Sequence, residues 1–211
     1  MNIQTYTVNP FQQNTYALFK EGKAILIDPG FFNASEVNLF LDDLEKHKAE
    51  LCAILLTHAH VDHILGLQRI KDRFDVPVYL SHADMHLWEN FFSQATMYGF
   101  PATPFDFEPV DYAREGVFTV GPFSMIVMNT PGHSPDHVSL YFESDGVLIA
   151  GDVLFQGSIG RTDLYKGDFE TLAKSIREKL YVLPDDTRVL SGHGPETTIG
   201  VEKMSNQFVR A

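Results

Sequence analysis

The feature that most constrains the fold is an apolar run that leads directly into a cluster of polar side chains. Residues Leu51–Leu56 are apolar without interruption, a pattern typical of a strand buried on both faces. The next seven residues read Thr57-His-Ala-His-Val-Asp-His63. Apolar residues at helical spacing follow at positions 64, 67, 70 and 74. The sequence therefore predicts a strand, a turn carrying three imidazoles and a carboxylate, and then a helix.

The turn has the chemistry of a metal site. Side chains two residues apart on an extended segment point the same way, so His58 and His60 can hold one ion. Asp62 and His63 then turn toward a second position as the helix begins. A histidine cluster without metal would have to tolerate mutual repulsion whenever it became protonated. We therefore expect bound metal at this turn.

Four more polar residues follow apolar, strand-like runs: Asp28, His133, Asp152 and His193. Loops at strand ends are where a rigid scaffold presents functional side chains. A single histidine or aspartate in a turn is more often structural. Together with the His58–His63 segment, however, these residues are what a site for two metal ions requires.

The remaining pattern predicts two similar halves, each made of strands and covering helices. Such a chain suits an α/β (α+β) fold with four αββα layers, and we expect a single domain over residues 1–211. Helices are expected from Ser35, after His63 and from Asp168, which is placed to cap its helix. The predicted strands cover residues 3–8, 14–19, 24–27, 51–56, 76–80, 118–120, 123–128, 138–142, 147–150 and 188–190.

Charge and composition exclude several classes of protein. The formal net charge of −12 argues against a nucleic-acid binder, which needs a basic surface. No apolar run approaches the roughly 18 residues of a membrane span, and a single cysteine allows no intramolecular disulfide. We expect a cytoplasmic enzyme that acts on a small molecule, with no nucleic-acid, membrane or obligate protein partner.

In order and spacing, the seven histidines and aspartates from His58 to His193 resemble the ligand set of the metallo-β-lactamase superfamily. The resemblance implies one metal held by His58, His60 and His133, a second held by Asp62, His63 and His193, and Asp152 bridging the two. Asp28 matches an aspartate just outside the ligand set, where it would orient a ligating imidazole.

Further strings narrow the resemblance to one branch. Gln13-Asn14-Thr-Tyr16, Gly151-Asp152-Val-Leu-Phe155 and Gly160-Arg161-Thr-Asp163 are similar to glyoxalase II, and most to its short type II hydroxyacylglutathione hydrolase-like form. That form lacks the C-terminal helical domain with which long glyoxalase II enzymes hold glutathione. β-Lactamases of this fold commonly have a cysteine ligand where this chain has Asp152, which weighs against that activity.

The resemblance implies a thioester hydrolase acting on S-lactoylglutathione or a related hydroxyacyl thioester. Two divalent ions, with zinc preferred and iron or manganese open, would share a bridging water whose pKa falls to about 7. Asp62 and Asp152 are the expected catalytic residues. Two alternatives use similar ligands: a lactonase, and a persulfide dioxygenase with one iron held by His58, His133 and Asp152.

Other residues have two interpretations each. Arg161 could anchor a substrate carboxylate, or it could pair with Asp163. Residues 88–104 are aromatic without clear periodicity, which indicates a loop over the site, or else core packing. Of the remaining histidines, His82 and His137 are expected beside the ligand set.

Overall fold

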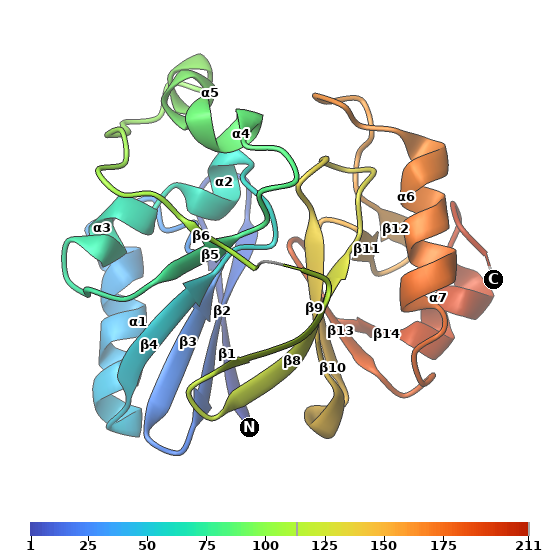
Figure 1. The fold of residues 1–211 in the computed structure, drawn as a ribbon, viewed down its shortest axis with the longest axis horizontal. Helices are drawn as coiled ribbons and strands as arrows, with labels where there is room; N and C mark the ends of the chain where they lie inside the picture. The colour runs from blue at the N-terminus through green and yellow to red at the C-terminus, as the bar shows by residue number, and fades with distance from the viewer. Residues whose placement is uncertain (113, 211) are drawn as a thin grey trace. The chain divides into compact units, whose positions relative to one another are not determined.

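The computed structural model describes residues 1–112 and 114–210, which form two compact units. Unit 1 contains residues 1–112 and 119–123, and unit 2 contains residues 114–118 and 124–210. Figure 1 colours the chain from blue, at the start of unit 1, to red, at the end of unit 2. Within the described ranges, no helix is long and apolar enough to cross a membrane. That both units make a single domain over residues 1–211 stays a prediction.

Unit 1 is built on a six-stranded sheet whose strands follow their order in the chain, from β1 to β6. β1, β2 and β3 pair antiparallel, whereas β3, β4, β5 and β6 pair parallel. The predicted strands of this half are confirmed. The strands are β1 (Asn2–Val8), β2 (Gln13–Lys20), β3 (Lys23–Ile27), β4 (Glu50–Leu55), β5 (Val78–Leu80) and β6 (Val110–Asp111).

The first helix of unit 1, α1 (Ala34–His47), packs its apolar face against this sheet. Asn33 caps the helix because its side chain accepts a hydrogen bond from the backbone N–H of Glu36. Val37, Phe40 and Leu44 point inward from α1 and belong to the same apolar core as residues of β1, β2 and β3. Figure 1 shows α1 running alongside the strands.

Two expectations for unit 1 need correction. The helix predicted after His63 is broken into α2 (Val61–Ile64) and α3 (Leu67–Lys71). The break falls at Gly66, where a Cβ would lie 2.7 Å from side-chain and backbone atoms of Phe31. The loop predicted for residues 88–104 in fact begins with helical turns, in α4 (His86–Glu89) and α5 (Phe91–Met97).

Two aromatic residues of this segment, Trp88 and Phe91, pack into the core of unit 1, whereas Phe92 and Tyr98 are exposed. Trp88 and Phe91 are buried. Each stacks on the ring of Phe105, with ring centroids 4.4 Å apart in both pairs. Core packing, the alternative interpretation of this segment, therefore accounts for its most buried rings.

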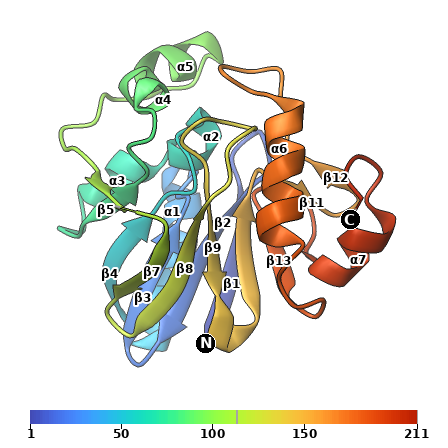
Figure 2. The same ribbon diagram turned by 45° about the vertical axis from the view of Figure 1, so that its right-hand side comes forward.

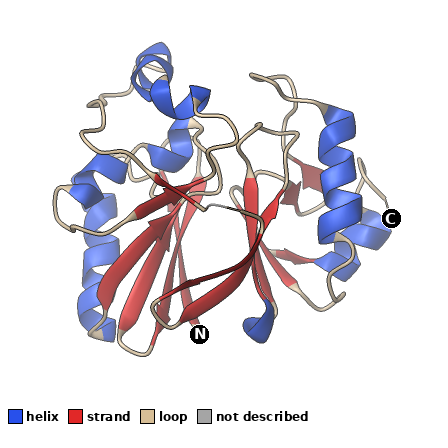
Figure 3. Cartoon of the chain, viewed as in Figure 1, coloured by secondary structure: helices blue, strands red, loops and turns tan. Residues whose placement is uncertain are grey.

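Unit 2 contains a second six-stranded sheet, in the order β14-β13-β10-β9-β8-β7. The predicted strands of this half are also confirmed, and Figure 3 draws the strands in red and the helices in blue. The strands are β7 (Gly116–Val120), β8 (Phe123–Asn129), β9 (Val138–Phe142), β10 (Val147–Gly151), β13 (Arg188–Ser191) and β14 (Thr197–Thr198). A separate hairpin, β11 (Leu154–Phe155) with β12 (Ser158–Ile159), follows β10.

The helices of unit 2 are α6 (Phe169–Ser175), which continues as a π-helical turn, η2 (Ile176–Leu180), and α7 (Ile199–Ser205). As predicted, Asp168 caps α6, accepting a hydrogen bond of 2.8 Å from the backbone N–H of Thr171. Leu172, Ile176 and Leu180 are fully buried against the sheet of unit 2. Figure 2 brings α6 and α7 forward.

Candidate metal centre

Asp28 follows β3 and has an unusual backbone conformation, with φ of +49° in the left-handed region. Three hydrogen bonds with residues of neighbouring strands hold its backbone there. Its N–H donates to the carbonyl of Leu55 at 3.1 Å. Its own carbonyl accepts from the Gln13 side-chain amide at 3.2 Å and from the Thr15 hydroxyl at 2.7 Å. The backbone of Asp28 is thus fixed from two neighbouring strands, and so is the direction of its carboxylate.

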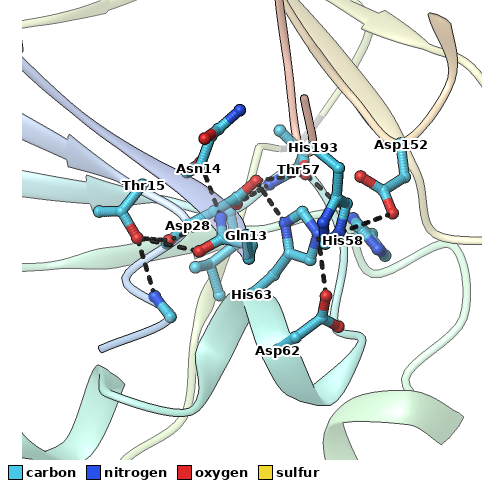
Figure 4. A network of polar contacts seen from close by, with 12 residues as sticks. Gln13, Asn14, Thr15, Asp28, Thr57, His58, Asp62, His63, Asp152 and His193 are labelled. Atoms are coloured by element: carbon cyan, nitrogen blue, oxygen red, sulfur yellow. Dashed lines mark hydrogen bonds and ion pairs between the residues drawn. The ribbon is translucent and has the colours of Figure 1, made fainter. Parts of the chain in front are cut away.

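The buried carboxylate of Asp28 accepts hydrogen bonds from the segment that follows β4. The backbone N–H and the hydroxyl of Thr57 both donate to it, each at 2.7 Å. Nδ1 of His63 lies 2.9 Å from the same carboxylate oxygen that accepts from the hydroxyl. Figure 4 shows Asp28 close to Thr57 and His63, with Gln13 beside it and Thr15 to its left.

These contacts determine which nitrogen of two imidazoles carries a proton. A carboxylate can only accept, so Nδ1 of His63 donates to Asp28. The Thr57 hydroxyl has already given its proton to Asp28, so it accepts from Nδ1 of His58, 3.0 Å away. In both neutral rings the lone pair is therefore on Nε2, the atom with which each ring would bind a metal.

The three imidazoles of this turn are buried and close together. The ring centroid of His58 lies 4.2 Å from that of His63 and 4.8 Å from that of His60. Donor atoms of Asp28, His58 and His63 fall within 4.8 Å of one another. Oδ2 of Asp62 lies 3.8 Å from Nε2 of His63. Unit 1 thus gathers four of the seven expected ligands, with Asp28 beside them.

Unit 2 gathers the other three. His133 lies in the loop between β8 and β9, Asp152 follows β10, and His193 follows β13. Oδ2 of Asp152 is 3.6 Å from Nε2 of His133 and 3.5 Å from Nε2 of His193. One carboxylate oxygen therefore lies close to two imidazole nitrogens.

The proton positions show that this arrangement suits a cation. Nδ1 of His133 lies 2.8 Å from the carbonyl oxygen of Arg161, which can only accept. The neutral ring therefore has its lone pair on Nε2, the atom facing Asp152. Two ligands bound to one zinc ion at about 2.0–2.2 Å lie roughly 3.4 Å apart at the tetrahedral angle. The separations in unit 2 are close to that value, so its donors fit a divalent metal.

The hairpin between Asp152 and Arg161 links two of the expected ligands, Asp152 and His133. Asp152 precedes β11, and Arg161, whose carbonyl holds His133, comes two residues after β12. Between them, Gly160 packs so closely that a Cβ would overlap the carbonyl oxygen of Asp152. The hairpin is also tied to the strand before His193, because the Ser191 hydroxyl donates to the carbonyl of Leu154 at 2.6 Å. All three expected ligands of unit 2 thus depend on this hairpin.

Residues 8–193 match the sequence pattern of the metallo-β-lactamase superfamily. The chain belongs to that superfamily. Its fold is the metallo-β-lactamase fold, so the predicted α/β (α+β) fold class is confirmed. The match extends over both sets of expected ligands, and the chain is a metallo-hydrolase of the superfamily.

Two curated relatives match almost the whole chain. The probable metallo-hydrolase YqgX of Bacillus subtilis (strain 168) is 42% identical over 99% of this chain and 98% of its own length. The hydroxyacylglutathione hydrolase GloC of Haemophilus influenzae is 38% identical over 100% of this chain and 99% of its own.

Two solved structures of the superfamily are also similar. The BLEG-1 B3 metallo-β-lactamase is 39% identical, with a TM-score of 0.90 and full coverage of both chains. TTHA1623 in a di-iron-bound form is 37% identical, with a TM-score of 0.84, over 98% of this chain and 100% of its own.

In this member of the superfamily the side chain of Arg161 forms an ion pair. Its Nε and one terminal nitrogen donate to the two carboxylate oxygens of Asp163, at 2.7 and 2.8 Å. Hydrogen bonding to Arg161 lowers the pKa of Asp163 to about 2. The structure thus shows the alternative interpretation of Arg161, while its role as a substrate anchor stays a prediction.

Four residues that support the expected ligands were not predicted from the sequence. Thr57 lies directly before the histidine motif, and a hydroxyl at that position could have indicated a hydrogen bond to a neighbouring imidazole. Gln13 and Thr15 lie in a string that marked the family, but their contact with the backbone of Asp28 is not visible in sequence. Asn9 is a fourth, because its side chain donates to the carbonyl of Asp62 at 2.9 Å.

Proposed function

We propose that this metallo-hydrolase cleaves a thioester, S-lactoylglutathione or a related hydroxyacyl thioester, at a centre holding two metal ions. The observation that carries the proposal is the position of Asp152, with one oxygen 3.6 and 3.5 Å from two imidazole nitrogens. A carboxylate so placed suits a ligand that bridges two cations. Similarity to the hydroxyacylglutathione hydrolase GloC supports the substrate class.

In this proposal the ligands of both units act as one centre, as the resemblance implies. His58, His60 and His133 would hold one ion, Asp62, His63 and His193 the other, and Asp152 both. When bound, two such ions lower the pKa of a shared water and polarise a carbonyl oxygen. Zinc suits nitrogen and carboxylate donors, and so do iron and manganese. The di-iron form of TTHA1623 supports iron as a further candidate.

The chain's own residues supply orientation and fixed proton positions. Asp28 and Thr57 keep the protons of His58 and His63 on Nδ1, so both rings present Nε2. Asp62, with its carbonyl held by Asn9, is placed to accept a hydrogen bond from the attacking water. The departing thiolate needs little help from an acid, since thiols have a pKa of about 8.5.

The deciding experiment measures hydrolysis of S-lactoylglutathione and metal content in the same protein sample. We expect turnover that rises with metal occupancy up to two ions per chain. Asp152→Ala should lose both ions together and with them the activity, because its carboxylate bridges them. Fully loaded protein that does not hydrolyse the thioester would rule out this substrate and leave the metal centre standing.

A second candidate function is β-lactam hydrolysis. The specific observation in its favour is the 39% identity to BLEG-1, which is described as a B3 metallo-β-lactamase. That similarity offsets the absence of a cysteine ligand, which weighed against this activity. Side-by-side kcat/KM values for a β-lactam and for S-lactoylglutathione separate the two functions. Oxygen consumption with glutathione persulfide would instead indicate the one-iron dioxygenase alternative, and turnover of a lactone the lactonase.

A further inference from the structure

The loop between β8 and β9 carries a second buried histidine, four residues after the expected ligand His133. The loop is closed at its ends by residues 130 and 137, where the backbone N–H of Thr130 donates to the carbonyl of His137 at 2.9 Å. The side chain of His137 is only 1% exposed. It is absent from the expected ligand set, so its burial needs another explanation.

The strand that leads to Asp152 departs from regular pairing just before that residue. β10 pairs with β13 in parallel, but the register shifts between Ile149 and Gly151. Gly151 has a φ of +54°, in the left-handed region that glycine tolerates best. The backbone N–H of Asp152 points instead to Nε2 of His137 and donates to it at 3.0 Å.

A chain of hydrogen bonds then fixes the direction of every proton. Since Nε2 of His137 accepts, its neutral ring carries the proton on Nδ1, which donates to the Thr130 hydroxyl at 2.9 Å. The Thr130 hydroxyl in turn donates to Ser139, also at 2.9 Å. The Ser139 hydroxyl donates to the carbonyl of Ala150 at 3.3 Å, on the strand that leads to Asp152. The chain thus begins and ends on the same short segment.

We propose that His137 is a positioning residue that holds the Asp152 carboxylate where it bridges the metals, without itself binding metal. The inference rests on the proposed role of Asp152. The loop then has two tasks: His133 binds an ion directly, and His137 sets the place of the shared carboxylate. Any change that removes the hydrogen bond from Asp152 to His137 should therefore shift the backbone of Asp152 and weaken metal binding.

The first test observes the hydrogen bond in metal-free protein, with ¹⁵N-labelled histidine and backbone. We expect Nε2 of His137 to resonate as an unprotonated nitrogen and Nδ1 as a protonated one. A scalar coupling between Nε2 and the amide nitrogen of Asp152 should appear across the hydrogen bond. A protonated Nε2, or rapid solvent exchange of the Asp152 amide, would overturn the proposal.

The second test compares His137→Leu with His137→Gln, whose amide oxygen can accept from Asp152 as Nε2 does. Metal affinity is measured by competition titration with a chromophoric chelator, together with metal content. Leucine should weaken binding about 10- to 100-fold, as loss of a residue that supports a ligand does. Glutamine should recover most of that loss. Metal binding in His137→Leu that equals the wild type would overturn the proposal.

A matched pair of variants at Thr130, which accepts the hydrogen bond from His137, keeps the proposal testable if the His137 variants misfold. Thr130→Val removes the acceptor for Nδ1 of His137 and should weaken metal binding, whereas Thr130→Ser should not. The control is Tyr181→Phe, which loses a buried hydrogen bond to the carbonyl of Val209, also in unit 2. It should keep wild-type metal affinity.

The outcomes separate this inference from the proposed function. If the wild-type protein bound no metal, both the proposed function and the proposed role of His137 would be wrong. Wild-type protein that binds two ions but hydrolyses no thioester would leave the role of His137 intact. Weaker binding in Tyr181→Phe, equal to that in His137→Leu, would show general destabilisation and overturn the role of His137 alone.

Discussion

Replacing Thr57 by valine tests whether one hydroxyl sets the proton position of His58. Valine keeps the shape of the buried side chain and removes its oxygen. That oxygen donates to Asp28 at 2.7 Å and accepts from Nδ1 of His58 at 3.0 Å. Asp28 keeps its bonds from the backbone N–H of Thr57 and from His63. The substitution therefore removes one donor to the Asp28 carboxylate and the acceptor for Nδ1 of His58.

The expected loss follows from these contacts. A hydrogen bond to a charged group contributes about 1.5–3 kcal/mol, and a buried donor left unsatisfied costs about 1–3 kcal/mol. Allowing for partial relaxation, the free energy of unfolding of metal-free Thr57→Val should fall by about 2–4 kcal/mol. Metal affinity should fall about 10- to 100-fold, because the His58 ring is no longer held in the tautomer that presents Nε2.

Urea unfolding of metal-free protein and a chelator competition titration measure the two effects. Thr57→Ser restores the hydroxyl and should recover both. Thr187→Val is a matched control, because Thr187 is equally buried and its hydroxyl makes no hydrogen bond within the described ranges. That variant should be neutral or slightly stabilising. If Thr57→Val unfolded and bound metal like the wild type, the reasoning on proton positions would be refuted.

Three further predictions concern unit 2. Gly160→Ala should weaken metal binding at least about tenfold in the same titration, because the new Cβ overlaps the carbonyl of Asp152. Glu202→Gln should lower the free energy of unfolding by about 1–3 kcal/mol, since the buried carboxylate accepts from three donors. The exposed Glu196→Gln should change it by less than about 1 kcal/mol. Burial, with the charge of Glu202, raises the pKa of Tyr181 from 10.0 to about 12. The raised pKa of Tyr181 therefore stabilises the fold fully below pH 10, and this contribution is lost as the pH rises to 12. In urea unfolding over this range, the free energy of unfolding of the wild type should fall more steeply with pH than that of Tyr181→Phe.

Much of the candidate site could be predicted because metal ligands are defined by residue type and local spacing. His58, His60 and Asp62 follow a buried strand within a few residues, so their convergence is a local property of the chain. His133, Asp152 and His193 each follow a strand, and unit 2 brings these three together. Their joint role with unit 1 stays a prediction.

The features of the fold and the site that the sequence did not predict depend on contacts between residues distant in sequence. At the break between α2 and α3, Gly66 lies so close to Phe31, 35 positions earlier, that a Cβ would not fit. Trp88 and Phe91, in the helical turns after residue 85, stack on Phe105. The residue spacing in this segment does not predict that contact. The proton position of His58 depends on Asp28 through Thr57, which only the folded chain reveals.

The most direct test of the account is anomalous diffraction from crystals of the metal-loaded protein, recorded on both sides of the metal absorption edge. We predict two ions, one on His58, His60 and His133, the other on Asp62, His63 and His193, with Asp152 bound to both. A single ion, or ions on other side chains while Asp152 binds none, would contradict it.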